Sequence, residues 1–408
     1  MSLGQEILSD CFEISNYKII QVNKCDRRIV LALERTVDSR CPHCGVMSPR
    51  YDSTKQTFLL GTLNCQGVYG ETKIYRVECG EHGTVTEAHG ISVGKRRYSH
   101  AVGNVVVHYT QKLDNVAASQ LFGISESTIY RIDVDELSSM EQHYLQALPQ
   151  AKTLSVDEVA YKRRHHYATV ISDYEQGKVL WLVKHRTQKA LKTGYKTLSP
   201  ILSNVDAVTM DLWPAFENAT GDCVPDADII YDRFHISRLL NRAVEQERRA
   251  YQKTVPDEQR KHIKRHSRWV LLKRQDNLSD NEQQHLQELK QANERLFELY
   301  LLKETCLDIF NPATSVKEAR KQLFAWIRPI LYKLDFLLLK RFAKTLLRRM
   351  RNILKWFKKP ISNAKAEGIN NVIKTLLKRA YGYKNFDYFR MKVLQKAGPL
   401  MKFATHSF

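Results

Sequence analysis

Alternating apolar and polar residues mark a strand-rich segment in the middle of the chain. The stretches TLSVDEVAY, HHYATVISDYE and KVLWLVKHR, all within 153–186, each have the pattern of a strand, and Gln176 and Gly177 form a turn between the second and the third. Residues 187–202 have helical periodicity, and two further strands follow in VDAVTMDLW and ADIIYDRFH. This predicts a mixed sheet in the order β-β-β-α-β-α-β, with three hairpin-linked strands and then parallel additions.

The rest of the C-terminal half is helical in its periodicity. From Ile236 to about Pro360 no strand is predicted. Beyond Pro360 a further helix has one apolar face, made of Ile369, Val372, Ile373, Leu376 and Leu377. A polar stripe of the same helix carries Glu367, Asn370, Asn371, Lys374 and Lys378. We expect this helix to pack on the sheet with Glu367 near its start.

A second pattern lies in NVAASQLFGISESTIYR, residues 115–131. Its apolar positions give one helical face, Gly123 makes a turn, and Ser125 is a favourable N-cap for a second helix. The pattern is typical of a DNA-reading helix-turn-helix, and an ordinary αα-hairpin is the alternative. The residues expected to face DNA are Ser125, Ser127, Thr128, Tyr130 and Arg131, and phosphate contacts are expected from Lys95, Arg96 and Arg97.

The N-terminal part contains two metal-ligand pairs. Cys41 and Cys44 form a Cys-x2-Cys turn, and Cys79 and His82 form a second pair after strand-like segments such as TKIYRVE. Two such turns joined by a hairpin resemble a zinc ribbon, so we predict a structural zinc at these four residues. Cys65 and His89 are rival fourth ligands, and a small β domain with reduced thiols and no metal is the alternative.

Charge narrows the class of partner. The formal net charge is +20, and residues 321–408 contain 21 Lys or Arg but only the acids Asp335, Glu367 and Asp387. A localised charge of this size attracts a polyanion, and nucleic acid is the polyanion that we expect. The sequence lacks an apolar run long enough to span a bilayer and a secretory signal, so we expect a cytoplasmic protein.

Two acids fall where an open α/β sheet binds ligands. Asp157 lies in the first strand of the predicted mixed sheet, and Asp211 ends the fourth. Carboxylates gathered there repel one another unless a cation lies between them, and Mg²⁺ is the hard, oxygen-seeking candidate. Glu158, Asp173 and Asp206 are nearby acids that we interpret as ordinary turn or surface residues.

The chain resembles the DDE transposases of bacterial insertion sequences, specifically the ISL3 family. The motifs that carry the resemblance are CPHCG, the helix-turn-helix at 115–131, LSVDEVAY, VTMDLWPAF, IIYDRFH, SNAKAEGINNVIK and AYGYKNFDYFR. The resemblance implies an RNase H-like fold with a catalytic triad of Asp157, Asp211 and Glu367, holding two Mg²⁺ ions for which Mn may substitute. One departure is that the second metal pair is Cys79 and His82, where this family commonly has two cysteines.

Further residues take their predicted roles from the resemblance. Asp232 and His235 look like the Cys-or-Asp-x-x-His signature of related enzymes and would support the site, although Asp232 could replace Asp211 as the second metal ligand. An all-α insertion implies a Trp that stacks on a displaced base, with Trp269 and Trp326 as candidates and core packing as the alternative. DNA contacts are also expected from Asn363, Asn370, Asn371, Lys374 and Lys378.

The sequence therefore predicts a multidomain α/β protein. Its expected domains are an N-terminal β region with zinc knuckles (1–94), a helix-turn-helix domain (95–150), an RNase H-like catalytic domain with a mixed sheet (151–235), an all-α insertion (236–360) and a C-terminal helical part of the catalytic domain (361–408). We expect a transposase that binds double-stranded DNA at its element's terminal inverted repeats, cleaves and transfers strands, and works as a homodimer or larger assembly.

Two other functions remain open from the sequence. A non-catalytic DNA-binding regulator derived from a transposase would need only the zinc and helix-turn-helix parts. A tyrosine recombinase would use the His235 and Arg238 pair with Tyr381 or Tyr383 as its nucleophile, which leaves Asp157 and Asp211 without a role.

Overall fold

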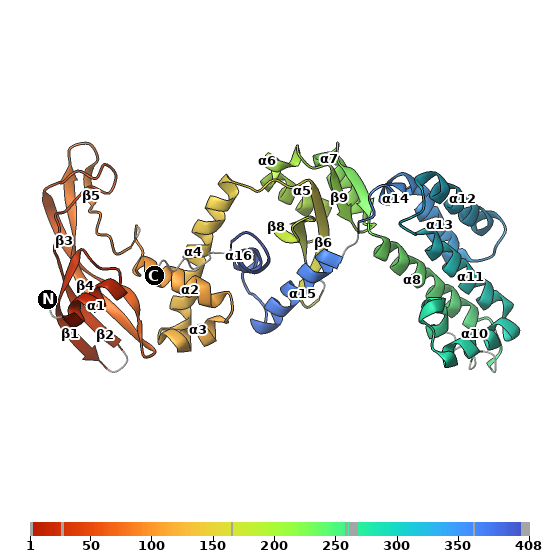
Figure 1. The fold of residues 1–408 in the computed structure, drawn as a ribbon, viewed down its shortest axis with the longest axis horizontal. Helices are drawn as coiled ribbons and strands as arrows, with labels where there is room; N and C mark the ends of the chain where they lie inside the picture. The colour runs from red at the N-terminus through yellow and green to blue at the C-terminus, as the bar shows by residue number, and fades with distance from the viewer. Residues whose placement is uncertain are drawn as a thin grey trace. The chain divides into compact units, whose positions relative to one another are not determined.

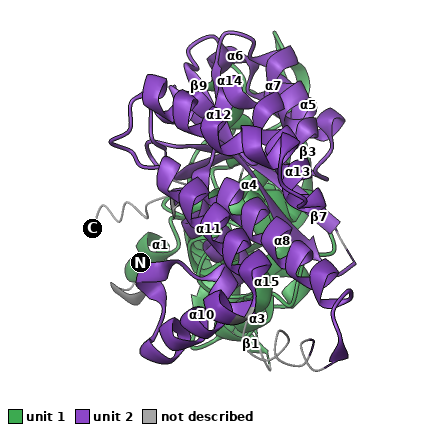
Figure 2. Cartoon of the chain, turned by 90° about the vertical axis from the view of Figure 1, so that its right-hand side faces the viewer, with its two compact units in different colours: residues 1–147, 376–408 green, residues 148–375 purple. Residues whose placement is uncertain are grey.

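A computed structural model describes residues 3–25, 28–92, 94–164, 166–257, 260, 268–361 and 364–400. The chain forms two compact units, shown in different colours in Figure 2. Unit 1 comprises residues 1–147 together with 376–408, and unit 2 comprises residues 148–375. Each unit contains one five-stranded mixed sheet, so the predicted mixed α/β class is confirmed. No helix among the described residues is both long enough and apolar enough to cross a bilayer.

The sheet of unit 1 is built around a long hairpin. Its strands are ordered β1-β2-β4-β3, with β5 paired to β4, and only the β2–β4 pair is parallel. Apolar residues such as Phe58, Leu31 and Ile74 form its core. The elements are α1 (Leu3–Cys11), β1 (Tyr17–Cys25), β2 (Arg28–Arg35), β3 (Arg50–Leu63), β4 (Gln66–Cys79) and β5 (Gly83–Thr86), at the red end of Figure 1.

Three helices follow, and the last two, on either side of Gly123, match the predicted pair joined by a glycine turn. The three helices are α2 (His100–Thr110), α3 (Asn115–Phe122) and α4 (Glu126–Gln146). Gly123 ends α3 with φ +64°, and a Cβ there would lie 1.8 Å from the Cys65 carbonyl oxygen, so only glycine fits. Ser125 caps α4 by accepting a hydrogen bond from the Thr128 amide at 3.3 Å, as predicted.

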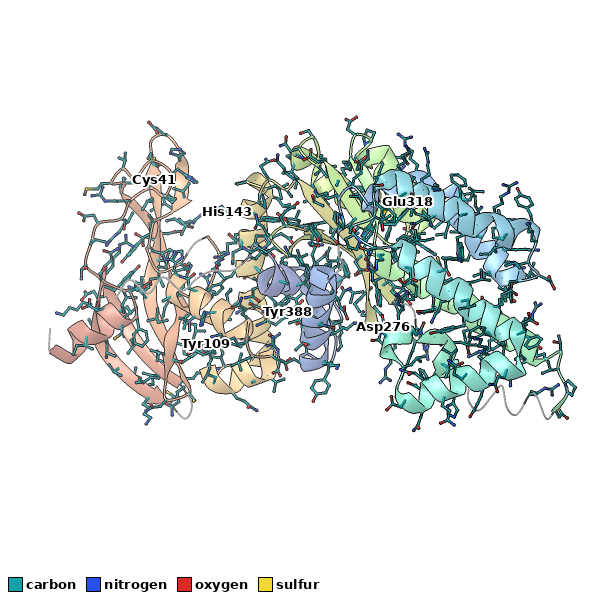
Figure 3. The ribbon with its side chains drawn as sticks, turned by 45° about the vertical axis from the view of Figure 1, so that its right-hand side comes forward. Cys41, Tyr109, His143, Asp276, Glu318 and Tyr388 are labelled. Atoms are coloured by element: carbon teal, nitrogen blue, oxygen red, sulfur yellow. The ribbon has the colours of Figure 1, made fainter. Side chains whose placement is uncertain are left out.

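The C-terminal helix α16 (Phe386–Ala397) belongs to unit 1 and packs on α4. Tyr388, labelled in Figure 3, donates through its hydroxyl to Asp133 at 2.7 Å and to Asn115 at 3.2 Å. The Lys392 ammonium lies 3.0 Å from the same Asp133 carboxylate and donates to the Thr110 carbonyl at 2.8 Å. Both members of this ion pair are buried, so α16 completes the core of the helical part of unit 1.

Replacing Lys392 with Met should therefore destabilise unit 1. The change leaves the Asp133 carboxylate buried without its cation, and removing one partner of a buried pair costs about 3–5 kcal/mol. Urea unfolding monitored by circular dichroism would measure the loss. Lys396→Met, at an exposed position one turn later on α16, is the matched control and should change the unfolding free energy little. Equal stability of the two variants would contradict the structural role of the pair.

The sheet of unit 2 has the strand order β10-β9-β6-β7-β8. β6, β7 and β8 are linked by antiparallel pairing, while β9 pairs in parallel with β6 and β10 in parallel with β9, as predicted. Helices α5 and α7 pack on each other through the Tyr195 and Thr220 hydroxyls, 2.8 Å apart. The elements are β6 (Thr153–Lys162), β7 (His166–Asp173), β8 (Lys178–Lys184), α5 (Gln188–Thr197), α6 (Ser199–Leu202), β9 (Ala207–Met210), α7 (Pro214–Cys223) and β10 (Asp228–Tyr231).

The segment after β10 is helical throughout its described residues, which confirms the predicted absence of strands there. The fifth strand of the sheet, β10, is shorter than predicted, because Asp232 caps a helix that begins at Arg233. The buried Glu247 carboxylate accepts hydrogen bonds from the Leu338 and Leu339 amides and so caps a second helix. The elements are α8 (Arg233–Gln252), η1 (Gln275–Asn277), α10 (Asp280–Ala292), α11 (Glu294–Ile309), α12 (Val316–Tyr332), α13 (Leu337–Arg348) and α14 (Met350–Trp356).

Helix α15 (Ala364–Arg379) is shared between the units, since residues up to Thr375 belong to unit 2 and the rest to unit 1. The segment 361–408, predicted as the C-terminal part of the catalytic domain, is thus divided between the two units. Its helix α16 belongs to unit 1, as does the predicted helix-turn-helix. The start of α15 is fastened to unit 2 by the Lys365 ammonium, which donates to the Glu175 carbonyl at 2.6 Å. The other predicted domain boundaries stay predictions.

Candidate active site and metal centre

Three acids stand in a row where the parallel strands of unit 2 end. The last parallel pairs are Val156 with Met210 and Met210 with Tyr231. On each of the three strands, the residue that follows the last parallel pair is an acid: Asp157, Asp211 and Asp232. Because paired strands lie about 4.8 Å apart, this register brings the three carboxylates to one edge of the sheet. The prediction had placed Asp157 and Asp211 at this edge, and the register supplies Asp232 as their neighbour.

Helix α8 brings an imidazole and a guanidinium to the middle acid, Asp211. The His235 Nε2 atom lies 2.5 Å from Asp211 and 3.6 Å from Asp232, and the Arg238 guanidinium lies 3.4 Å from Asp211. Asp232 is buried and accepts a hydrogen bond from the Phe234 amide at 3.1 Å, so it is the N-cap of α8. The Asp211 side chain is 16% exposed and the Asp232 side chain only 4%, so we interpret Asp211 as the more accessible carboxylate and Asp232 as its support. Arg238 was not predicted here, although its position one turn after His235 is a usable signal.

Glu367 reaches the same site from the first turn of α15. A cleft of about 670 Å³ is lined by Asp157, Asp211 and Glu367, together with Asp232, His235, Arg238, Asn370 and Lys374. One turn after Glu367, the Asn370 amide donates to the Asp157 carboxylate at 2.7 Å. The sequence predicts a DNA contact for Asn370, and in the structure its amide contacts Asp157.

Burial and mutual repulsion disfavour ionised carboxylates in this cleft. Burial, and then the nearby charge of Asp211, raise the pKa of Asp157 from 3.8 to about 6, while hydrogen bonds from the Glu158 amide and Asn370 act in the opposite direction. Burial also raises the pKa of Asp232. Asp157 and Asp232 are therefore harder to ionise in this cleft than in water.

This shift predicts a pH dependence of stability. Asp157 has a higher pKa folded than unfolded, so its favourable contribution is complete below about pH 4 and is lost as the pH rises through about 6. The loss corresponds to about 3 kcal/mol for a shift of about two pKa units. Urea unfolding of the metal-free protein between pH 4 and pH 7 would show it. Asp157→Asn should lack this slope, and Asp206→Asn, at an exposed position before β9, should keep it.

The residues of the cleft fit a divalent cation in their chemistry. Adjacent carboxylates with raised pKa values are oxygen ligands whose repulsion a bound Mg²⁺ would relieve. Asp157, Asp211 and Glu367 line one cleft, but their ligand atoms do not meet at one point. In the described part of the chain, only Cys41, Cys44, Cys79 and His82 bring three or more ligand atoms close together.

Those four residues form the predicted zinc site. Their ligand atoms all lie within 4.8 Å of one another at the end of the unit 1 sheet that carries Cys41 in Figure 3. The His82 Nδ1 atom lies 3.6 Å from the Cys79 sulfur, and this contact lowers the pKa of the Cys79 thiol to about 6. The rival ligands lie elsewhere: Cys65 is in the turn between β3 and β4, and the His89 ring accepts from the Ile91 amide. A Cys3His set suits tetrahedral zinc.

Comparison with known proteins identifies the family of this chain. The model of DDE transposases of the ISL3 type, a family described as transposase, matches residues 154–393, which is more than half of the chain. The chain belongs to the ISL3 family of transposases. The transposase for insertion sequence element IS1001 of Bordetella parapertussis is 32% identical over 246 residues, which cover 59% of this chain and 59% of that protein. The chain thus spans less than two thirds of that relative's length.

A second relative and one solved structure are more distant. The transposase for insertion sequence element IS1557 of Mycobacterium tuberculosis is 23% identical over 316 residues, covering 71% of this chain and 70% of that protein. The Drosophila P element transposase strand transfer complex has a TM-score of 0.36 and 11% identity, with 74% of this chain and 92% of that chain covered.

The predicted DNA-reading residues of this ISL3 transposase lie on the surface of unit 1. Ser125, Ser127, Tyr130 and Arg131 are exposed at the start of α4, and Thr128 is half-buried. Upstream, Lys95 and Arg97 are exposed. Arg96 instead pairs with Glu136 at 2.6 Å and holds α4 in place. On α15, Asn371, Lys374 and Lys378 are exposed, while Asn363 lies outside the described residues.

The two candidate base-stacking tryptophans differ in exposure. Trp326 is buried, and its indole donates to the Leu302 carbonyl at 2.8 Å, so we interpret it as a core residue and keep the stacking proposal for Trp269, which is 60% exposed. A third tryptophan, Trp213, lies two residues after Asp211 and is held by the Arg186 guanidinium over its ring. Arg186 also pairs with Glu158 at 2.9 Å, on the rim of the cleft.

The structure offers the tyrosine recombinase alternative no support. His235 and Arg238 contact Asp211, one of the acids that this alternative leaves without a role. Burial raises the pKa of the Tyr383 phenol, which makes it a poorer nucleophile.

Proposed function

We propose that this chain binds the terminal inverted repeats of its insertion sequence and catalyses Mg-dependent DNA strand cleavage and strand transfer through Asp157, Asp211 and Glu367. The observation that carries the proposal is the single cleft lined by all three acids, although Glu367 comes from a helix that lies beyond the whole helical segment. The strand order of unit 2 is the order expected of an RNase H-like catalytic domain interrupted by an all-α insertion. Family membership supports the same reaction class.

The cleft residues would divide the work. Two Mg²⁺ ions, or Mn²⁺ in their place, would activate the attacking water or 3′-hydroxyl and stabilise the leaving oxygen. Asp157, Asp211 and Glu367 would hold them. Asn370 orients the Asp157 carboxylate, and His235 fixes the side chain of Asp211 against α8. Lys374 lines the cleft and would neutralise a DNA phosphate.

Unit 1 would select the DNA. The exposed start of α4, with Ser125, Ser127 and Arg131, would enter the major groove, and the zinc site would hold the adjoining β region in shape. Both ends of an element must be cut together, so we propose that a homodimer or larger assembly acts on the bacterial nucleoid in the cytoplasm. Binding should weaken steeply with salt because it releases counterions.

The test is end cleavage by the purified full-length chain. Labelled duplexes that contain the element's terminal repeats would be incubated with Mg²⁺ or with a chelator, and the products separated on a denaturing gel. We expect strand cuts at the repeat boundary only with metal. Tight, sequence-specific binding without any cut would favour the DNA-binding regulator instead.

A further inference from the structure

The connection between α15 and α16 is a built turn that presents a tyrosine to solvent. Tyr381 and Gly382 have φ values of +50° and +94°, and the Gly382 amide donates to the Leu377 carbonyl at 2.9 Å. The turn ends at Asn385, whose side chain caps α16. Tyr381 is 99% exposed. We refer to residues 380–385, with the sequence AYGYKN, as the tyrosine turn.

The tyrosine turn is fastened on both sides to the helices of unit 1. Just before it, the Arg379 guanidinium donates to the Lys112 and Gln111 carbonyls at 2.5 and 3.2 Å. Just after it, Tyr388 and Lys392 reach Asp133 on α4. These contacts fix the turn against α4 and against the segment that follows α2.

The position of the tyrosine turn places it beside the predicted DNA-reading helix. A cavity of about 640 Å³ is lined by the turn, by the start of α3 and by the first residues of α4, including Glu126 and Tyr130. Tyr130 packs edge-on against Tyr388, with ring centroids 4.8 Å apart. The exposed Ser127 and Arg131 lie on the same first turns of α4. One end of the helix pair therefore carries both the reading residues and the turn.

Charge identifies the partner of this surface. Residues 376–400 contain six Lys or Arg and one acid, Asp387, which pairs with Arg390 at 2.6 Å. Lys112, which follows α2, and Arg131 of α4 are exposed and add positive charge, against the two acids Asp114 and Glu126 that line the same cavity. Lys378 and Lys384 are exposed as well. A fully exposed tyrosine among lysines can donate its hydroxyl to a phosphate, and a polyanion is the ligand that this surface complements.

We propose that the tyrosine turn is a second DNA-contacting element, in which Tyr381 and Lys384 bind the phosphate backbone of the duplex whose major groove receives α4. The inference rests on the proposed function, because it needs α4 to read DNA. It assigns a role to the AYGYKN motif, which the catalytic cleft leaves without one.

The test compares matched tyrosine and lysine variants of the full-length chain. Tyr381→Asn removes the ring but keeps a residue that tolerates the left-handed backbone, and Tyr332→Asn changes a tyrosine that is 81% exposed on α12. Lys384→Gln is matched by Lys317→Gln, also exposed on α12. Fluorescence anisotropy would give the Kd for an end-containing duplex across a salt series.

We expect Tyr381→Asn to weaken binding about tenfold, as for loss of one charge-assisted hydrogen bond, while Tyr332→Asn binds like wild type. Lys384→Gln should reduce the slope of log K against log salt by about 0.9, the value of one phosphate contact, and Lys317→Gln should not. Hydroxyl-radical footprinting of Tyr381→Asn should lose protection at a few backbone positions and keep the rest.

The outcomes separate this inference from the proposed function. If Arg131→Ala loses end-specific binding while Tyr381→Asn and Lys384→Gln bind like wild type, the tyrosine turn is not a DNA contact and the proposed function stands. If Tyr381→Asn changes the oligomeric state and not the Kd, the turn serves a second copy of the chain and the inference is wrong. If wild type shows no preference for end DNA, both proposals fail.

Discussion

Asp211→Asn is expected to reduce end cleavage by about a thousandfold or more while leaving the Kd for end DNA within about twofold. The substitution keeps the size of the side chain and removes the charge that a divalent cation needs. His235 and Arg238 both contact Asp211, and so the neutral amide would also lose the ion pair with Arg238. Single-turnover cleavage with Mg²⁺, followed on denaturing gels, measures the rate separately from binding.

The chain offers close controls for this experiment. Asp206 and Asp211 flank the two ends of the same strand, β9, so Asp206→Asn tests whether any loss of charge near this strand matters. Glu367→Gln should match Asp211→Asn, whereas Glu288→Gln on α10 changes an exposed acid far along the chain. Wild-type cutting by Glu367→Gln would remove it from the triad. Full activity of Asp211→Asn with loss in Asp232→Asn would exchange the roles of those two acids.

Loss of zinc is the second large effect. Mass spectrometry should find one zinc per chain, and His82→Ala should abolish it, because three thiolates alone leave the tetrahedral set incomplete. Structural zinc in small domains contributes apparent binding free energies of about 10 kcal/mol or more, so the midpoint of thermal unfolding of unit 1 should fall clearly. A chelator should reproduce the effect in wild type.

The rival ligand supplies the control. Cys65→Ser should retain one zinc and a wild-type melting curve, since Cys65 lies in a hairpin turn away from the four ligands. Zinc content unchanged in His82→Ala but lost in Cys65→Ser would exchange their roles. Intact unit 1 stability after complete removal of zinc would show that the metal is dispensable for folding.

Local patterns predicted the elements of this chain well. Alternation gave the strands of the unit 2 sheet, and a glycine followed by serine gave the turn and N-cap before α4. Cysteine spacing predicted which four residues gather as candidate metal ligands, because two short turns joined by a hairpin leave few other ways to arrange them. These features depend on neighbouring residues, and neighbours are what a single sequence displays.

Contacts between distant residues were harder to predict. The hydrogen bond between Asn370 and Asp157 depends on the rotation of α15 about its own axis where it packs across the sheet end. The periodicity of the sequence does not fix that rotation. The burial of Trp326 depends on the packing of α11, α12 and α13. Likewise, the apolar face of α16 fits any core of the right shape, and only tertiary packing assigns it to α4 in unit 1.

The discontinuous chain path of unit 1 has a consequence for synthesis. Its helical core needs Tyr388, Lys392 and the rest of α16, which are translated after residues 1–147 and after the whole of unit 2. By then Asp157, Asp211 and Glu367 have all been translated. A prematurely terminated chain that stops before α16 therefore lacks a completed helical core around α4, and every chain that completes it already carries all three acids.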